Sequence, residues 1–325
     1  MDAKTDRSVM AERHKDKQVI IVAGPTASGK SALALAIAER FGGEIINADS
    51  MQVYREFQVL TARPDTTEEA RTSHHLYGIL PAMESCSAGF WLEMALDVIA
   101  DLRRRRRVPV VCGGTGLYLK VLLEGIAPMP FVPPEIIDEA RQLFEQHGGD
   151  VFREKLAELY PGAGAKLGAG DRQRLNRAYS VVKATGLSLA DWQSEQPKGP
   201  PIGADFTCIV LKPEREALYR RIEERFDAMV AAGAVDEVAA LLPGHLDPNL
   251  PVMKALGVPE FARYLRGECR LAEAVEKAKQ ATRNFAKRQF TWFRNQIAAD
   301  LVFEGFGDTE AATSAAFRLL EPLKE

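Results

Sequence analysis

An eight-residue run near the start of the chain constrains its fold more than any other feature. The run Gly24-Pro-Thr-Ala-Ser-Gly-Lys-Ser31 matches the pattern G-x-x-x-x-G-K-[ST] and lies between an apolar run, Val19–Ala23, and an amphipathic segment, Ser31–Phe41. A strand, a glycine-rich loop and a helix in this order form a phosphate-binding loop, whose backbone amides and helix N-terminus point at phosphate oxygens. The predicted loop consists of Gly24, Pro25, Thr26, Ala27, Ser28, Gly29, Lys30 and Ser31. Lys30 adds a positive charge, and Ser31 is the predicted protein ligand of Mg²⁺.

The alternation of short apolar runs with helix-length segments extends well beyond this loop. Further buried strands are predicted at Glu44–Ala48, Val108–Cys112 and Phe206–Leu211, and a long helix at Ala88–Arg107. Such alternation predicts an α/β fold, namely a P-loop NTPase-like parallel sheet with helices on both faces.

A helical region interrupts this pattern and divides the chain. It begins with the proline-rich run Ala127–Pro134 and contains three predicted helices, at Pro134–His147, Asp150–Tyr160 and Asp171–Thr185. We therefore predict a flexible N-terminal tail (1–17), a first part of the P-loop core (18–126), an all-helical insertion domain (127–200) and a second, mostly helical part of the core (201–325).

Composition narrows the class of protein. The formal net charge of −3 argues against nucleic-acid binding through bulk charge, but it permits a local basic surface. The four cysteines, Cys86, Cys112, Cys208 and Cys269, lie far apart and predict neither a zinc site nor a disulfide framework. The polar start and the absence of long apolar runs predict a soluble, cytoplasmic protein without a signal peptide or membrane span. A monomer is the default expectation.

The position of the acidic side chain distinguishes classes of phosphate enzyme. Hydrolysing P-loop enzymes end an apolar strand with Asp, whereas the strand ending at Val111 is followed here by Cys112. The acid instead follows the second strand, as Asp49. Strand ends of a parallel sheet converge on the ligand crevice, so Asp49 and Thr115 are both expected to face the phosphate loop.

Two other functions share some of these features. A small-metabolite or nucleotide kinase has the same loop and core, and would transfer phosphate from ATP. A non-catalytic RNA-binding protein could keep a vestigial phosphate loop, although the intact Lys30, Ser31, Asp49 and Thr115 argue against decay.

Several motifs in a fixed order give a more specific indication. They are Gly24–Ser31, Ala48-Asp-Ser-Met-Gln-Val-Tyr54, His74-His-Leu76, Gly113-Gly-Thr-Gly-Leu-Tyr118, Asp171-Arg-Gln-Arg-Leu-Asn-Arg177, Arg221-Ile-Glu-Glu-Arg-Phe226 and Thr282-Arg-Asn-Phe-Ala-Lys-Arg-Gln-Phe-Thr-Trp-Phe-Arg294. Together they resemble the tRNA dimethylallyltransferases (tRNA isopentenyltransferases) over most of the chain. Departures from the usual pattern include Arg63 in place of Lys, Val258 in place of Tyr, and Ile137 where many relatives have a basic residue.

The resemblance implies a prenyl transfer with the phosphate loop around a diphosphate. The enzyme would move a dimethylallyl group from dimethylallyl diphosphate to the exocyclic amine of the adenosine on the 3′ side of the tRNA anticodon. Asp49 matches the general base of the family, and Thr115 matches a residue near the reacting groups. Lys30, Mg²⁺ and Arg215, the match to the diphosphate-binding arginine, would stabilise the leaving group.

The same resemblance implies contacts with the anticodon stem-loop of tRNA. An adenine in a stacked loop must be extruded to reach a buried diphosphate. The predicted RNA-contacting residues are Asp49, Ser50, Met51, Gln52, Thr115, Gln173, Arg174, Leu175, Asn176, Arg177, Lys287, Arg288, Trp292 and Arg294. By contrast, the run Arg103–Arg107 is interpreted as a solvated helix end, and adjacent His74 and His75 are interpreted as structural.

Overall fold

The computed structural model describes residues 17–194 and 199–324. Its sheet is six-stranded and wholly parallel within these residues, in the order β3-β2-β4-β1-β5-β6. The strands are β1 (Gln18–Ala23), β2 (Gly43–Asn47), β3 (His74–His75), β4 (Val108–Gly113), β5 (Asp205–Leu211) and β6 (Leu301–Phe303). The P-loop NTPase-like α/β fold predicted from the sequence is therefore confirmed.

The chain divides into two compact units, and each is described by itself. The first contains the sheet and comprises residues 1–123 and 202–325; the second is Glu124–Pro201. The boundaries predicted for the helical insertion were 127–200, and most of the predicted tail lies outside the described residues.

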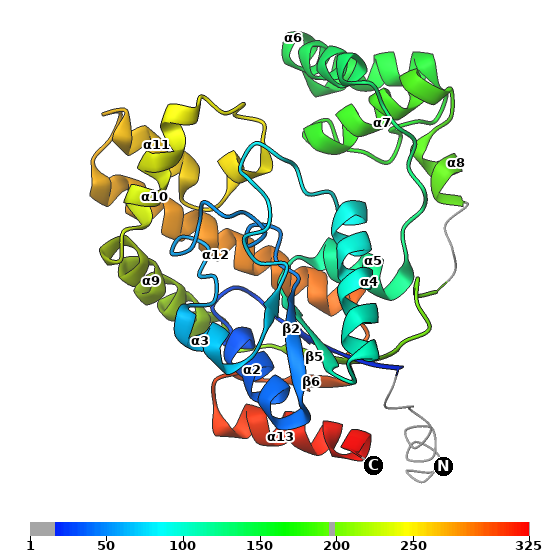
Figure 1. The fold of residues 1–325 in the computed structure, drawn as a ribbon. Helices are drawn as coiled ribbons and strands as arrows, with labels where there is room; N and C mark the ends of the chain where they lie inside the picture. Colours follow the sequence, from blue (N-terminus) through cyan, green and yellow to red (C-terminus); the bar gives the residue numbers. More distant parts are fainter. Residues whose placement is uncertain (1–16, 195–198, 325) are drawn as a thin grey trace. The chain divides into compact units, whose positions relative to one another are not determined.

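Helices cover both faces of the sheet in the first unit (Figure 1). Its helices are α2 (Lys30–Phe41), α3 (Thr66–Arg71), α4 (Ala88–Arg104), α5 (Gly116–Glu124), α9 (Arg215–Ala231), α10 (Ala234–Leu241), α11 (Val258–Leu265), α12 (Leu271–Gln296) and α13 (Glu310–Leu320), with short 3₁₀ turns at Leu242–Gly244, Pro251–Lys254 and Glu321–Lys324. One face buries Ile20, Val22 and Val110 against α2 and α13. On the other face α4 packs on β4 and β2, and all residues of β1 are buried.

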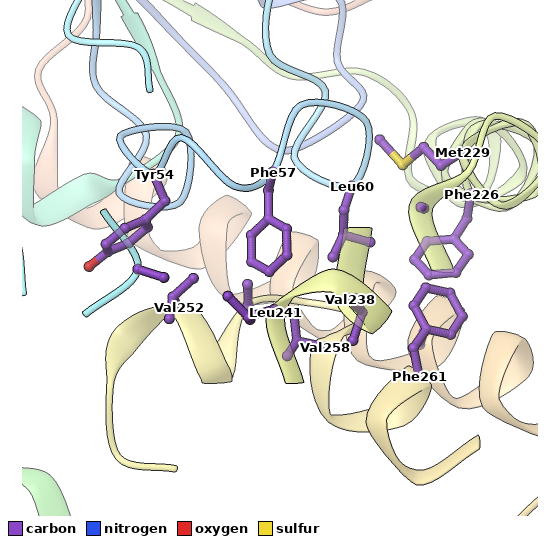
Figure 2. Close-up of a cluster of buried hydrophobic side chains, with 14 of the residues drawn as sticks. Tyr54, Phe57, Leu60, Phe226, Met229, Val238, Leu241, Val252, Val258 and Phe261 are labelled. Carbon is purple, nitrogen blue, oxygen red and sulfur yellow. The ribbon is translucent and has the colours of Figure 1, made fainter. Parts of the chain in front are cut away.

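A second apolar layer joins the C-terminal helices to the loop that follows β2 (Figure 2). Tyr54, Phe57 and Leu60 of this loop are buried against α9, α10 and α11, where Phe226 and Phe261 lie with ring centroids 5.9 Å apart. The loop begins directly after Asp49, so this layer anchors one side of the predicted site.

The second unit is entirely helical in its described residues. It contains α6 (Pro134–Leu159), α7 (Arg172–Thr185) and α8 (Leu189–Ser194), which pack around buried Phe152, Leu156 and Leu175. The α6 span departs from helical geometry at Gly148, whose φ is +71°. The two helices predicted there thus join through a kink that glycine permits.

The basic run at the end of α4 is exposed at Arg104, Arg105 and Arg106, as expected of a solvated helix end, and it also binds a buried carboxylate. The predicted helix to Arg107 ends at Arg104, because Arg106 adopts a left-handed conformation with φ +56°. Arg105 then donates to both oxygens of buried Glu44 at 2.7 and 3.0 Å, and Arg107 lies 3.3 Å from the same carboxylate. His75 completes the network at 2.7 Å from Glu44, consistent with its structural interpretation.

Candidate active site

The phosphate loop links β1 to α2 at the carboxyl edge of the sheet. Gly29, which precedes α2, has φ +83°, and the backbone at Ala27 is also left-handed with φ +63°. These conformations curl the chain around the N-terminus of α2, where an anion is favoured by free amides and by the helix dipole. Burial lowers the pKa of Lys30, and the nearby Asp49 carboxylate opposes this shift.

The ends of β2 and β4 are fastened to each other beside this loop. The Ala48 amide donates to the Cys112 carbonyl at 2.8 Å, and the Thr115 amide donates to the Ala48 carbonyl at 3.1 Å. A Cβ at Gly113 would overlap the Ala48 backbone, so this close approach requires glycine. The turn after β4 is therefore set directly against the turn after β2.

This contact brings Thr115 against Ser50, the residue that follows Asp49. The Ser50 amide donates to Thr115 Oγ1 at 2.9 Å, and the Met51 amide donates to Asp49 Oδ1 at 2.9 Å. Asn47 also stabilises this turn, because its Oδ1 accepts a hydrogen bond from the Asp49 amide at 2.8 Å. The sequence analysis did not single out Asn47 or Gly113 as contributors to the site, although both lie in or next to motifs that it quoted.

A cavity of about 270 Å³ opens at the phosphate loop. Its cationic lining comprises Lys30, Arg63, Arg221 and Arg225. Arg225 Nη2 lies 3.4 Å from Thr26 Oγ1, and burial lowers the pKa of Arg225 while Asp49 opposes this shift. Arg221 makes a two-point ion pair with Asp308, which also lines the cavity.

Arg215 does not line this cavity, and neither do Asp49 and Thr115. Arg215 lies in a second cavity of about 820 Å³, together with Lys212, Lys287 and Arg294. Among the described residues, it is therefore Arg225 and Arg221, rather than Arg215, that line the cavity together with Lys30. Both belong to the motif Arg221–Phe226, and their i,i+4 spacing places them on one face of α9.

The predicted RNA-contacting residues are distributed over both units. In the first unit Ser50, Met51, Gln52 and Trp292 are partly exposed, whereas Lys287, Arg288 and Arg294 of α12 are exposed. In the second unit Gln173 and Arg174 are exposed, and Asn176 and Arg177 are partly buried. The Leu175 side chain is fully buried in the core of that unit, and its amide donates to the Asp171 carbonyl at 2.9 Å.

The Gln52 amide group is already engaged inside the first unit. Its Nε2 donates to the carbonyls of Thr61 and Ala62, each at 2.9 Å. These bonds position the loop that carries Arg63.

Metal binding would depend on few protein atoms. No group of three or more His, Cys, Asp or Glu side chains suited to a metal occurs in the described part of the chain. A hydroxyl such as that of Ser31 suits Mg²⁺, which keeps several waters and is commonly held by substrate phosphates.

No helix in the described part of the chain is long and apolar enough to cross a membrane.

Two family models match the chain. The model described as IPP transferase matches residues 52–296, and the model described as Isopentenyl transferase matches residues 17–78. A protein named tRNA dimethylallyltransferase from Rhodospirillum rubrum is 52% identical over 284 residues, which cover 87% of each chain. Its namesake from Phenylobacterium zucineum is 51% identical over 283 residues, 87% of this chain and 91% of the relative.

Solved structures show the same similarity. The full-length tRNA isopentenylpyrophosphate transferase from Bacillus halodurans superposes with a TM-score of 0.67 and 31% identity, covering 95% of this chain and 98% of that one. A eukaryotic dimethylallyltransferase acting on tRNA gives a TM-score of 0.78 at 26% identity, with 94% and 78% covered. The chain therefore belongs to the IPP transferase family.

Proposed function

We propose that this protein is a tRNA dimethylallyltransferase. It transfers the dimethylallyl group of dimethylallyl diphosphate to the exocyclic amine of the adenosine 3′ to the anticodon and releases diphosphate. The observation that carries the proposal is the turn Asp49–Ser50, where Ser50 is hydrogen-bonded to Thr115 beside the phosphate loop, in a chain where Val111 of β4 is followed by Cys112 rather than by Asp.

The chemistry follows from the groups at this edge of the sheet. The adenine nitrogen attacks the first carbon of the dimethylallyl group, the carbon–oxygen bond breaks, and its electron pair leaves with the diphosphate. Asp49 accepts the proton that the amine loses, a role that typically contributes about 10²–10⁴-fold. Thr115 Oγ1 accepts from the Ser50 amide and so keeps this turn in place.

Cations and amides stabilise the charge that develops on the diphosphate. The N-terminus of α2, Lys30 and Arg225 act on it, and a partly desolvated cavity strengthens these interactions. When bound, Mg²⁺ would neutralise part of the same charge, held by Ser31 and by the phosphate oxygens themselves.

RNA recognition combines exposed cations with an aromatic surface. Lys287, Arg288 and Arg294 on α12 are exposed, and Trp292 lies in the same two turns of the helix. Such a surface suits the phosphates and unstacked bases of an anticodon loop. The exposed residues of α7 provide a second contact region for the stem-loop.

The test is a transfer assay with purified protein, Mg²⁺, labelled dimethylallyl diphosphate and an unmodified anticodon stem-loop. Label should appear on the adenosine beside the anticodon, and a stem-loop with guanosine at that position should stay unlabelled. ATP is offered in a parallel reaction. ATP turnover without prenyl transfer would refute the proposal and support a P-loop kinase, which the family match does not favour.

A variant assigns the base. Asp49→Ala should abolish transfer while the stem-loop still binds, since the phosphate loop and α12 are unchanged. Retained transfer activity would show that another group accepts the proton.

A further inference from the structure

Gln289 of α12 connects two loops of the first unit that are distant in sequence. Its side chain is 5% exposed. Oε1 accepts from the Thr26 amide at 2.9 Å, and Nε2 donates to the Gly114 carbonyl at 2.8 Å. The same buried amide group therefore accepts a hydrogen bond from the phosphate loop and donates one to the turn after β4.

The fit around this amide is close. A Cβ at Gly114 would overlap Gln289 Nε2, so a larger residue there would displace this amide group. Three residues further along the helix, the Trp292 ring occupies the space where a Cβ of Gly116 would lie. The turn is therefore held against α12 at two points, and the phosphate loop is held at Thr26.

The two loops carry different parts of the proposed chemistry. Thr26 belongs to the loop of Lys30, where the diphosphate leaves. The Gly114 turn carries Thr115, which accepts from the Ser50 amide next to Asp49. A planar amide that bonds to both loops fixes the separation between the leaving-group site and the base.

We propose that Gln289 is a positioning residue that holds the phosphate loop and the Gly113–Thr115 turn at one fixed separation; its catalytic consequence rests on the proposed transferase function. Group transfer requires the reacting atoms to be aligned within a fraction of an ångström. A misplacement of about 1 Å can cost about 100-fold in rate.

The test compares Gln289→Leu, which keeps the size of the side chain and removes both hydrogen bonds, with Gln280→Leu as a matched control. Gln280 lies on the same helix, but it is exposed and its side chain bonds to Asn284 and Arg283 of the same helix rather than to either loop. Amide exchange, followed by mass spectrometry on the full-length variants, should accelerate at Gly24–Ser31 and Gly113–Tyr118 in Gln289→Leu alone. These segments are remote in sequence from the substitution.

Kinetics provide the second measurement. In Gln289→Leu, kcat should fall about 100-fold while KM for the stem-loop changes little, because alignment is lost and the RNA-contacting cations remain. Gln289→Asn, whose amide is one methylene shorter and cannot span both loops, should behave alike and covers the case in which the leucine variant fails to fold.

The outcomes separate the two hypotheses. Unchanged exchange in both loops, or a kcat like that of the wild type, would overturn the role of Gln289 while leaving the transferase function intact. A wild-type protein without prenyl transfer would refute the function, and the exchange data would still decide whether Gln289 holds the loops.

Discussion

Glu44→Gln should destabilise the protein strongly at neutral pH, although Glu44 lies at the edge of the sheet opposite the phosphate loop. The Glu44 side chain is 6% exposed and faces Arg105, Arg107 and His75. Hydrogen bonds from Arg105 are the main cause that lowers its pKa from 4.5 to about 2. At about 1.4 kcal/mol per pKa unit, lowering the pKa from 4.5 to about 2 corresponds to about 3–4 kcal/mol of folding free energy.

The pH dependence has a definite direction. Because the folded-state pKa of Glu44 lies below its unfolded value, the stabilisation is complete above about pH 4.5 and is lost as pH falls toward 2. Urea denaturation followed by circular dichroism should show a large difference between wild type and Glu44→Gln at pH 7 that shrinks at acidic pH. Glu39→Gln is the control, because its ion pair with Arg71 is exposed and should contribute little.

Two results would refute this reasoning. A Glu44→Gln variant as stable as the wild type at pH 7 would show that hydration stabilises the Arg105 and Arg107 side chains as much as the Glu44 carboxylate does. A stability difference that stays constant down to about pH 3 would show that ionisation of Glu44 is not its origin.

Three further predictions concern the site and the second unit. Arg225→Ala should weaken the binding of inorganic diphosphate, measured by calorimetry, about 10- to 100-fold, because a charged hydrogen bond is lost. Arg215→Ala should weaken this binding less, and the reverse order of the two effects would assign diphosphate binding to Arg215. Gly113→Ala should cost about 1–3 kcal/mol or more, since its methyl group would overlap Ala48, and a normal melting temperature would contradict that contact. Phe152→Ala should cost the second unit about 3–5 kcal/mol, because the ring is fully buried there; unchanged protease resistance of that unit would argue against its small core.

The fold was predictable because its central strands are buried on both faces. β1, β4 and β5 read as continuous apolar runs, and the phosphate loop fixes β1 at a known place in a parallel sheet. β3 and β6 were not predicted: they are two and three residues long, too short for a periodic signal. They lie at the two edges of the sheet, where tertiary pairing decides the conformation.

The site was only partly predictable, for a similar reason. Motif order indicated the phosphate loop and the segments that carry Asp49 and Thr115, but it did not indicate which arginine faces the loop. That choice depends on the face of α9 that packs toward the phosphate loop and α12, and Arg225 rather than Arg215 lines the cavity with Lys30. Gln289 lies in a quoted motif, yet its two partners are distant in sequence and only the folded chain brings them together.

The discontinuous first unit has a consequence for synthesis on the ribosome. β1 pairs with β5, so the central strand of the sheet stays half-paired until residues 205–211 have emerged. The Thr26 amide gains its hydrogen bond to Gln289 later still, once residue 289 has been synthesised. The second unit is contiguous in sequence and has its own small core, and it can fold before the sheet around it is complete. A nascent chain arrested before β5 should therefore present an ordered helical unit next to an N-terminal segment that chaperones and proteases still recognise as unfolded.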